Sequence, residues 1–164
     1  MKTFMIVLAF ILMSVSLAAA AGSPSVRSNI AEDVKIYNKG VKLMMAKKFS
    51  RAEKQFRKAI ALNETFAEAH NNLAYTLRKQ GPDHYEEALK HYNRSIELNP
   101  GLDEPYMYRG VLYVQMGNNN LALADHETLV SRNSQLASEL QFVVENGREK
   151  EPEQFFGVSR RIDT

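Results

Sequence analysis

Cysteine is absent from this sequence of 164 residues. Its absence excludes disulfides, thiolate metal sites, a catalytic thiol and a lipid-modified N-terminal cysteine. The sequence also lacks a large excess of charge of either sign, since the net charge is only +2 at pH 7. It therefore gives no sign of a nucleic-acid-binding protein. A chain of this size without disulfides depends on its apolar core, and 45% hydrophobic residues is a globular composition.

Enzyme signatures are missing as well. The sequence has no Gly-rich phosphate loop, no dinucleotide-binding fingerprint, no G-x-S-x-G and no H-E-x-x-H. Glu87 and His91 stand one helical turn apart, but two ligands on an exposed helix face make a weak metal site. We therefore expect no catalytic activity, no metal and no other cofactor.

The one long apolar run lies at the N-terminus. A lysine is followed by apolar residues over 4–13 and then by a run of alanines. A positive start, a short apolar core and a small-residue end predict a secretory signal peptide over 1–21, cleaved after Ala20 or Ala21. The apolar run is shorter than the ~20 residues that span a bilayer, and an uncleaved anchor is the alternative. We expect an exported protein, periplasmic or secreted, without stable membrane insertion after cleavage.

The rest of the chain repeats itself. Small residues recur at Gly40, Ala74 and Gly110, which are 34 and 36 positions apart. The two extra positions fall at Pro82 and Asp83, where we expect an insertion in a turn, since turns tolerate insertions best. Apolar residues then follow at three- and four-residue spacing, which indicates amphipathic helices in each repeat.

Each repeat carries the same residue types in the same register. Repeat one has Ile36, Gly40, Leu43, Phe49, Ala52, Phe56 and Ala59. Repeat two has His70, Leu73, Ala74, Leu77, Ala88, Tyr92 and Pro100. Repeat three has Tyr106, Gly110, Tyr113, Gly117, Ala122 and His126. His70 and His126 stand where large aromatics are usual, so we expect packed core histidines. The first and third repeats depart most from the pattern, for example with Lys47 in place of glycine.

This pattern resembles the tetratricopeptide repeat (TPR) family, whose unit is 34 residues long. The resemblance implies an all-α fold, a right-handed superhelix of three helix-turn-helix repeats and a capping helix at the C-terminal end. The expected segments are the signal peptide 1–21, a linker 22–32, the TPR domain 33–146 (repeats about 33–66, 67–102 and 103–136, capping helix about 134–146) and a charged tail 147–164. Phe155 and Phe156 in the tail either dock onto the superhelix or serve a partner in a mobile tail.

In the TPR family the first helix of each pair lines a concave groove. The matching positions here are Tyr37, Val41, Met44, Asn71, Tyr75, Arg78, Met107, Val111 and Val114. Some family members grip a C-terminal carboxylate with Lys, Asn and Arg, but Tyr37, Val41, Glu104 and Tyr108 occupy those places, so we do not expect that clamp. Partner contact is favoured for Tyr75 and Arg78, whereas packing between repeats is an equal alternative for the valines.

Repeat one is basic, with few acids opposite nine basic residues, Lys35, Lys39, Lys42, Lys47, Lys48, Arg51, Lys54, Arg57 and Lys58. A solvated face explains them, and an anionic partner is the alternative. We expect an adaptor or scaffold that binds a protein or peptide segment in its groove, without nucleic acid. The alternative is a self-associating structural module in which the C-terminal tail occupies the groove.

Overall fold

The computed structural model describes residues 24–150 and contains only helices and connecting turns over that range. The helices are α1 (Pro24–Met45), α2 (Phe49–Leu62), α3 (Ala67–Arg78), η1 (Pro82–His84, a 3₁₀ turn), α4 (Tyr85–Leu98), α5 (Glu104–Gln115), α6 (Asn119–Ser131) and α7 (Leu136–Asn146). The expected all-α repeat fold is confirmed. The signal peptide, Phe155 and Phe156 lie outside the described residues.

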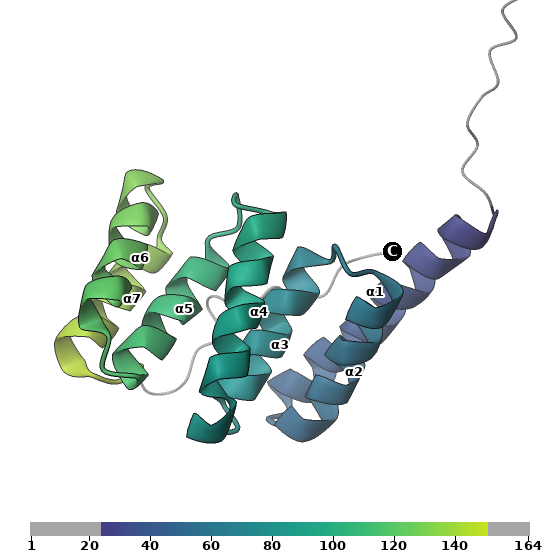
Figure 1. The fold of residues 1–164 in the computed structure, drawn as a ribbon, viewed down its shortest axis with the longest axis horizontal. Helices are drawn as coiled ribbons and strands as arrows, with labels where there is room; N and C mark the ends of the chain where they lie inside the picture. The colour runs from purple at the N-terminus through teal and green to yellow at the C-terminus, as the bar shows by residue number, and fades with distance from the viewer. Residues whose placement is uncertain (1–23, 151–164) are drawn as a thin grey trace, which may run out of the picture.

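The helices form three antiparallel pairs that stand side by side in a row (Figure 1). Helix α1 packs on α2, α3 on α4 and α5 on α6, and each pair also contacts the next. Helix α7 packs against both α5 and α6 and closes the row, as expected of the capping helix. The first helix of each pair (α1, α3 and α5) is called an inner helix below, and the second (α2, α4 and α6) an outer helix.

Small residues let the helices approach closely, and they do so in two different ways. A Cβ atom added to Gly40 of α1 would lie 2.6 Å from the ring of Phe56 in α2. At Gly110 of α5 the corresponding neighbour is Leu140 of α7, 2.5 Å away. Repeat three has His126 at the position of Phe56, and the capping helix supplies the side chain that covers the glycine. The nearest neighbour is therefore the second helix of the pair at Gly40 and the capping helix at Gly110.

The turns explain several sequence features. Gly81, Gly117 and Gly147 have φ angles of 116°, 79° and 69°, the left-handed region in which glycine is favoured, and each follows an inner helix or α7. Lys47 occupies the corresponding place after α1 with a φ of 55°. The expected two-residue insertion lies in η1, immediately after Gly81.

Helix α1 is longer at its start than the sequence pattern predicts. It begins at Pro24, so most of the expected linker 22–32 is helical. A proline fits the first turn of a helix because the first amides have no partner within the helix. Within the described part of the chain, no helix is both long and apolar enough to cross a membrane.

Candidate functional site

Arg78 ends inner helix α3 in the middle repeat, and its side chain has no exposed surface. Its two terminal nitrogens donate hydrogen bonds of 3.0 Å to the two carboxylate oxygens of Glu149, and one of them also donates to Gln115 Oε1 at 3.2 Å. A two-point arginine–carboxylate pair is among the stronger and most direction-specific interactions in proteins. The middle of the inner face therefore holds a carboxylate.

Two tyrosine rings flank the guanidinium. The Arg78 Cζ atom lies 5.3 Å from the centroid of Tyr75 and 5.3 Å from that of Tyr108. The two rings pack edge to face at 4.9 Å, and Phe49 packs on Tyr75 at 6.3 Å. Cation–π contacts of this kind stabilise a desolvated arginine. The aromatic walls therefore fix the direction in which the guanidinium presents its hydrogen-bond donors.

The charged state of Arg78 is secure. Burial alone disfavours its charged form, but the neighbouring Tyr92 and Glu149 outweigh burial and raise the pKa of the guanidinium above its usual value. Burial also raises the pKa of the Tyr92 hydroxyl, against the opposing effect of Arg78. The site therefore presents a permanent cation beside neutral phenols.

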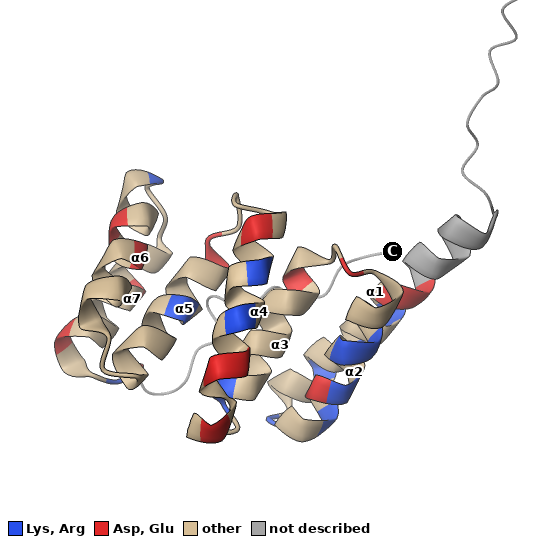
Figure 2. Cartoon of the chain, in the orientation of Figure 1, with Lys and Arg blue, Asp and Glu red and all other residues tan. Residues whose placement is uncertain are grey.

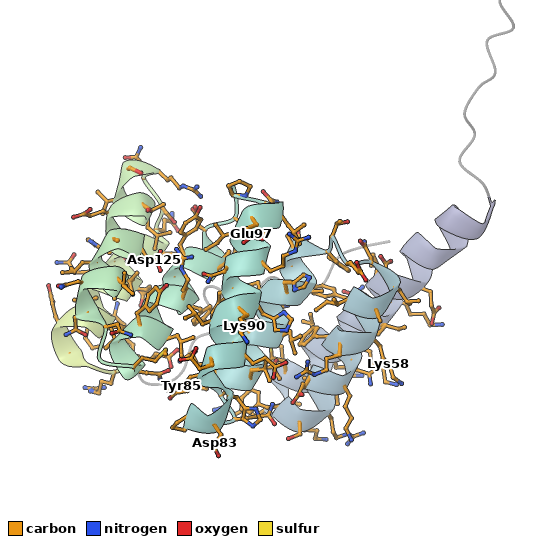
Figure 3. The ribbon with its side chains drawn as sticks, viewed as in Figure 1. Lys58, Asp83, Tyr85, Lys90, Glu97 and Asp125 are labelled. Carbon is orange, nitrogen blue, oxygen red and sulfur yellow. The ribbon has the colours of Figure 1, made fainter. Side chains whose placement is uncertain are left out.

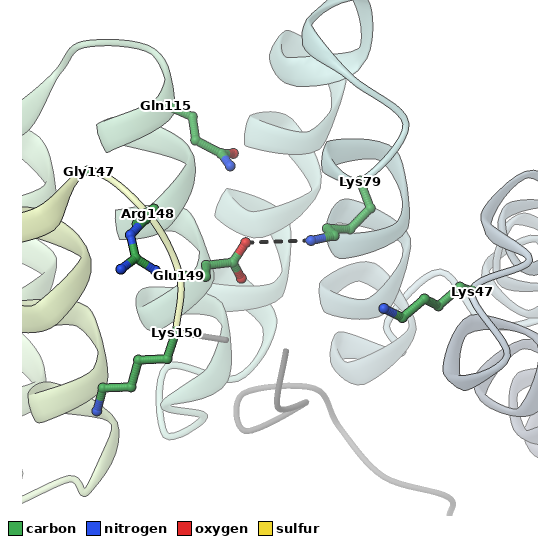
Figure 4. Close-up of a pocket in the computed structure, with 7 residues that line it drawn as sticks. All are labelled: Lys47, Lys79, Gln115, Gly147, Arg148, Glu149 and Lys150. Atoms are coloured by element: carbon green, nitrogen blue, oxygen red, sulfur yellow. Dashed lines mark ion pairs between the residues drawn. The ribbon is translucent and has the colours of Figure 1, made fainter. Parts of the chain in front are cut away.

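Glu149 reaches this site because α7 ends at Gly147, whose left-handed backbone turns the chain back towards the inner helices. The segment 147–150 borders a hollow of about 310 Å³ between the ends of the inner helices. Lys79, Gln115 and Lys47 line the other sides, and Lys79 Nζ lies 3.5 Å from a Glu149 oxygen (Figure 4). The surroundings of the Glu149 carboxylate are thus predominantly basic.

The residues expected to line the groove all lie on the inner helices, as the pattern predicts. The structure buries eight of them, Tyr37, Val41, Met44, Asn71, Tyr75, Arg78, Met107 and Val111, and half-buries Val114. Tyr37 packs on Phe66 at 4.8 Å and on Phe56 at 5.8 Å, and its hydroxyl accepts a hydrogen bond of 3.0 Å from Asn72. Their role in partner contact stays a prediction.

The sequence pattern predicted Tyr75 and Arg78 but not the residues that contact Arg78 or its bound carboxylate. It assigned Glu149 only to a charged tail, and it did not single out Gln115 or Lys79. The sequence offers one signal for Glu149, because a buried arginine requires an acidic partner and the tail after the capping helix is rich in acids. Tyr108 was noted only as a residue that replaces a clamp position, whereas it forms one wall of the arginine site.

The basic residues of repeat one lie on α1, on α2 and in the turn between them, and all nine are exposed (Figure 2). Arg57 is held in place by Glu53 at 2.9 Å and by Glu87 of α4 at 2.8 Å. The hydrogen bond with Glu87 outweighs burial and raises the pKa of Arg57. The remaining basic residues form a solvated face, in line with the first of the two expected explanations.

His70 is buried, as expected, and it is bound to a second histidine. Its Nδ1 lies 2.9 Å from Nδ1 of His91, and its Nε2 lies 3.2 Å from the carbonyl oxygen of Glu64. Glu87 approaches His91 only to 3.9 Å. Between residues 24 and 150 there is no group of three His, Asp or Glu side chains that could hold a metal ion. The histidine pair joins α3 to α4.

Comparison with known proteins gives a consistent result. Residues 56–90 match the family model described as "Tetratricopeptide repeat", and residues 84–117 match the model described as "TPR repeat". The human protein named "Tetratricopeptide repeat protein 6" is 34% identical over 74 residues, which span 45% of this chain and only 14% of that protein.

Among solved structures, a chain of the "CopN-Scc3 complex" superposes with a TM-score of 0.58, covering 72% of this chain and 70% of that one. Its sequence identity is 21%, so this likeness concerns the fold. The repeat register, the helix pairs with their capping helix and the matched family models agree, and helical repeats of this kind serve as protein–protein interaction modules. Residues 56–117 of the chain therefore match tetratricopeptide repeats, within a row of helix pairs of the same kind.

Proposed function

We propose that this chain is an adaptor that binds a segment of another protein on its inner helices, around Arg78. The observation that carries the proposal is that Arg78 already holds a carboxylate from the non-helical segment after α7, between two tyrosine rings. An arginine fork with aromatic walls is suited to recognising an acidic side chain within a peptide.

The surroundings favour a peptide with apolar residues next to that acid. Met44 lies on inner helix α1, and Met107 and Val111 lie on inner helix α5, whereas Arg78 belongs to α3, the inner helix of the middle repeat. Methionine side chains adapt to differently shaped apolar groups, which suits a surface that accepts a peptide rather than a small molecule. The proposed activity is binding alone, without catalysis.

We also propose export, on the strength of the N-terminal sequence. A lysine, a short apolar run and alanines at residues 2–21 have the order of a secretory signal peptide. The mass of the protein purified from cells tests this directly. A mature protein that starts at residue 21 or 22 supports export through a cleaved signal, and an intact N-terminus contradicts it.

Photo-crosslinking in the cells that produce the protein tests the binding function. A photoreactive amino acid at Lys47 or Gln115 stands beside the hollow next to Arg78, and both positions are exposed. Matched controls at Lys58 and Lys90 project from the outer helices α2 and α4 (Figure 3). We expect one discrete foreign protein from positions 47 and 115 and none from the controls. The same products from all four positions, or none at all, would contradict the proposal.

A further inference from the structure

The segment after α7 is attached to the inner face by its acidic side chain. Glu149 lies two residues beyond the helix C-cap Gly147 and spans the guanidinium of Arg78 with both carboxylate oxygens. The Lys79 ammonium group adds a third positive contact at 3.5 Å. Three charged contacts at one glutamate are more than a solvated tail requires.

The residues that follow Lys150 in the sequence are complementary in charge to the basic residues that line the hollow. Glu151 and Glu153 follow Glu149 at alternate positions, and Phe155 and Phe156 come next. In an extended strand, alternate residues point to the same side. Lys47, which also lines the hollow, stands beyond Lys79 in the direction of α1 (Figure 4). Lys47 and Lys79 are thus of opposite charge to the acidic residues that follow Glu149 in the sequence.

The length of chain is sufficient for this path. The sequence continues for 14 residues after Lys150, and extended chain spans at most about 3.3 Å per residue, or about 46 Å. Neighbouring packed helices lie about 8–10 Å apart, so the row from α5 through α3 to α1 requires about 20 Å. Residues 151–164 can therefore reach across all three inner helices.

We propose that residues 148–164 of the same chain are the resident ligand of the inner face, anchored by Glu149 on Arg78, and that a partner segment must displace them. This rests on the proposed function of the inner face as a peptide-binding surface. The occupant is the chain's own segment rather than that of a second copy, because Glu149 and Arg78 belong to one chain and Gly147 leaves only one intervening residue, Arg148. Binding of a partner is thereby made competitive with an intramolecular contact.

The place of the segment is tested with a photoreactive phenylalanine analogue at position 156 in the full-length chain. An equal mixture of isotopically light and heavy protein is irradiated, and the linked peptides are identified by mass spectrometry. We expect links to α1 or α3 in which both peptides carry the same isotope label. Links between light and heavy peptides would identify a second copy as the occupant and overturn the proposal, as would an absence of links to the inner helices.

The role of the anchor is tested by limited trypsin digestion of full-length Glu149→Gln, with Glu145→Gln on the exposed end of α7 as the matched control. Cleavage within the segment, after Arg160 or Arg161, follows the fraction of molecules in which the segment is detached. Loss of a charged two-point contact should raise that fraction, and hence the cleavage rate, about tenfold or more. Equal cleavage rates for the two variants would overturn the proposal.

Both tests use the protein without any partner. A negative result in either test would therefore contradict the proposal that residues 148–164 occupy the inner face, and it would not bear on the adaptor function. Conversely, failure of crosslinking to a foreign protein from Lys47 and Gln115, with the intramolecular links present, would contradict the adaptor function alone.

Discussion

Arg78 and Glu149 are 71 residues apart in the sequence and form two parallel hydrogen bonds of 3.0 Å between α3 and the segment after α7. This pair joins α3 of the middle repeat to the segment after the capping helix, and Arg78 also donates to Gln115 of α5. It therefore sets where the chain goes after the superhelix closes. The competition between the chain's own segment and a partner follows from this single relationship.

A second buried pair should be essential to stability. Arg109 of α5 donates to Asp125 of α6 at 2.6 and 3.0 Å, and to Asn93 of α4 at 2.7 Å. Burial raises the pKa of Asp125, and Arg109 opposes this. We expect Asp125→Ala to lower the free energy of unfolding by about 3 kcal/mol, because it leaves a largely buried cation without its counter-charge.

Urea denaturation measures this loss, and an exposed pair provides the control. Arg94 and Glu97 form an ion pair of 3.1 Å with side chains 46% and 63% exposed. Glu97→Ala should change the free energy of unfolding by less than about 0.5 kcal/mol, since exposed pairs contribute little. Equal effects of the two substitutions would show that the Arg109 pair does not hold the repeats together.

Acid should destabilise the fold through the histidine pair. Burial lowers the pKa of His70, and burial together with His70 lowers the pKa of His91 to about 4, from 6.5 for the exposed side chain. The unfolded chain therefore takes up protons below pH 6.5 that the folded chain excludes. The contribution of the neutral histidine pair to stability is fully present above pH 6.5. It is lost as the pH drops towards 4, and the free energy of unfolding falls by at most about 1.4 kcal/mol per pH unit for each proton.

The comparison of wild type with His91→Gln between pH 7 and 5 isolates this effect, because most carboxylates stay ionised in that window. Glutamine keeps a hydrogen-bonding group near His70 and has no proton to gain. We expect the slope of unfolding free energy against pH to become smaller in the variant. An unchanged slope would mean that the histidine pair is not the source of the acid sensitivity.

Close helix packing makes a sharp prediction at Gly40. An added methyl group would meet the ring of Phe56 at 2.6 Å, and that ring is fully buried. We expect Gly40→Ala to lower the free energy of unfolding by about 1–3 kcal/mol, despite the higher helix propensity of alanine. Gly101→Ala is the control, since its nearest atom is the Asn99 side-chain oxygen at 3.2 Å. A gain in stability for Gly40→Ala would contradict the packing described here.

The irregular turn of repeat one can be improved. Lys47 adopts a φ of 55°, where a side chain is strained and where the corresponding residues of the later repeats are Gly81 and Gly117. We expect Lys47→Gly to raise the free energy of unfolding by up to about 1 kcal/mol, measured by thermal or urea denaturation. Gly117→Ala, the reverse change at an equivalent place, should lower it. The same sign for both would refute the equivalence of the two turns.

Much of the fold could be predicted because a repeat shows each feature three times. The spacing of Gly40, Ala74 and Gly110 locates the inner helices, and Gly147 marks the end of the capping helix. The start of α1 could not be predicted, since residues 24–32 lack the apolar periodicity that reveals the other helices. The contact of Gly110 with Leu140 was hidden too, because the capping helix lies outside the repeat that it covers.

The site was predicted only in part, for a physical reason. The repeat register assigns Tyr75 and Arg78 to the inner face, since their positions follow from helix periodicity. The position of Glu149 depends on the left-handed turn at Gly147 and on the buried charge that draws it in, and neither leaves a periodic signal. Low exposure of the inner-helix residues likewise reflects long-range contacts that the local pattern does not contain.

The most direct test of the account compares the yield of crosslinks to the foreign protein from position 115 in the otherwise wild-type chain and in Glu149→Gln. If the resident segment and the partner compete for the inner face, the apparent affinity for the partner scales with the fraction of molecules in which the segment is detached from that face. We expect a yield that rises in Glu149→Gln, up to about tenfold where the partner is limiting, and stays level in Glu145→Gln. An unchanged or lower yield in Glu149→Gln would contradict the claim that both segments share the site at Arg78.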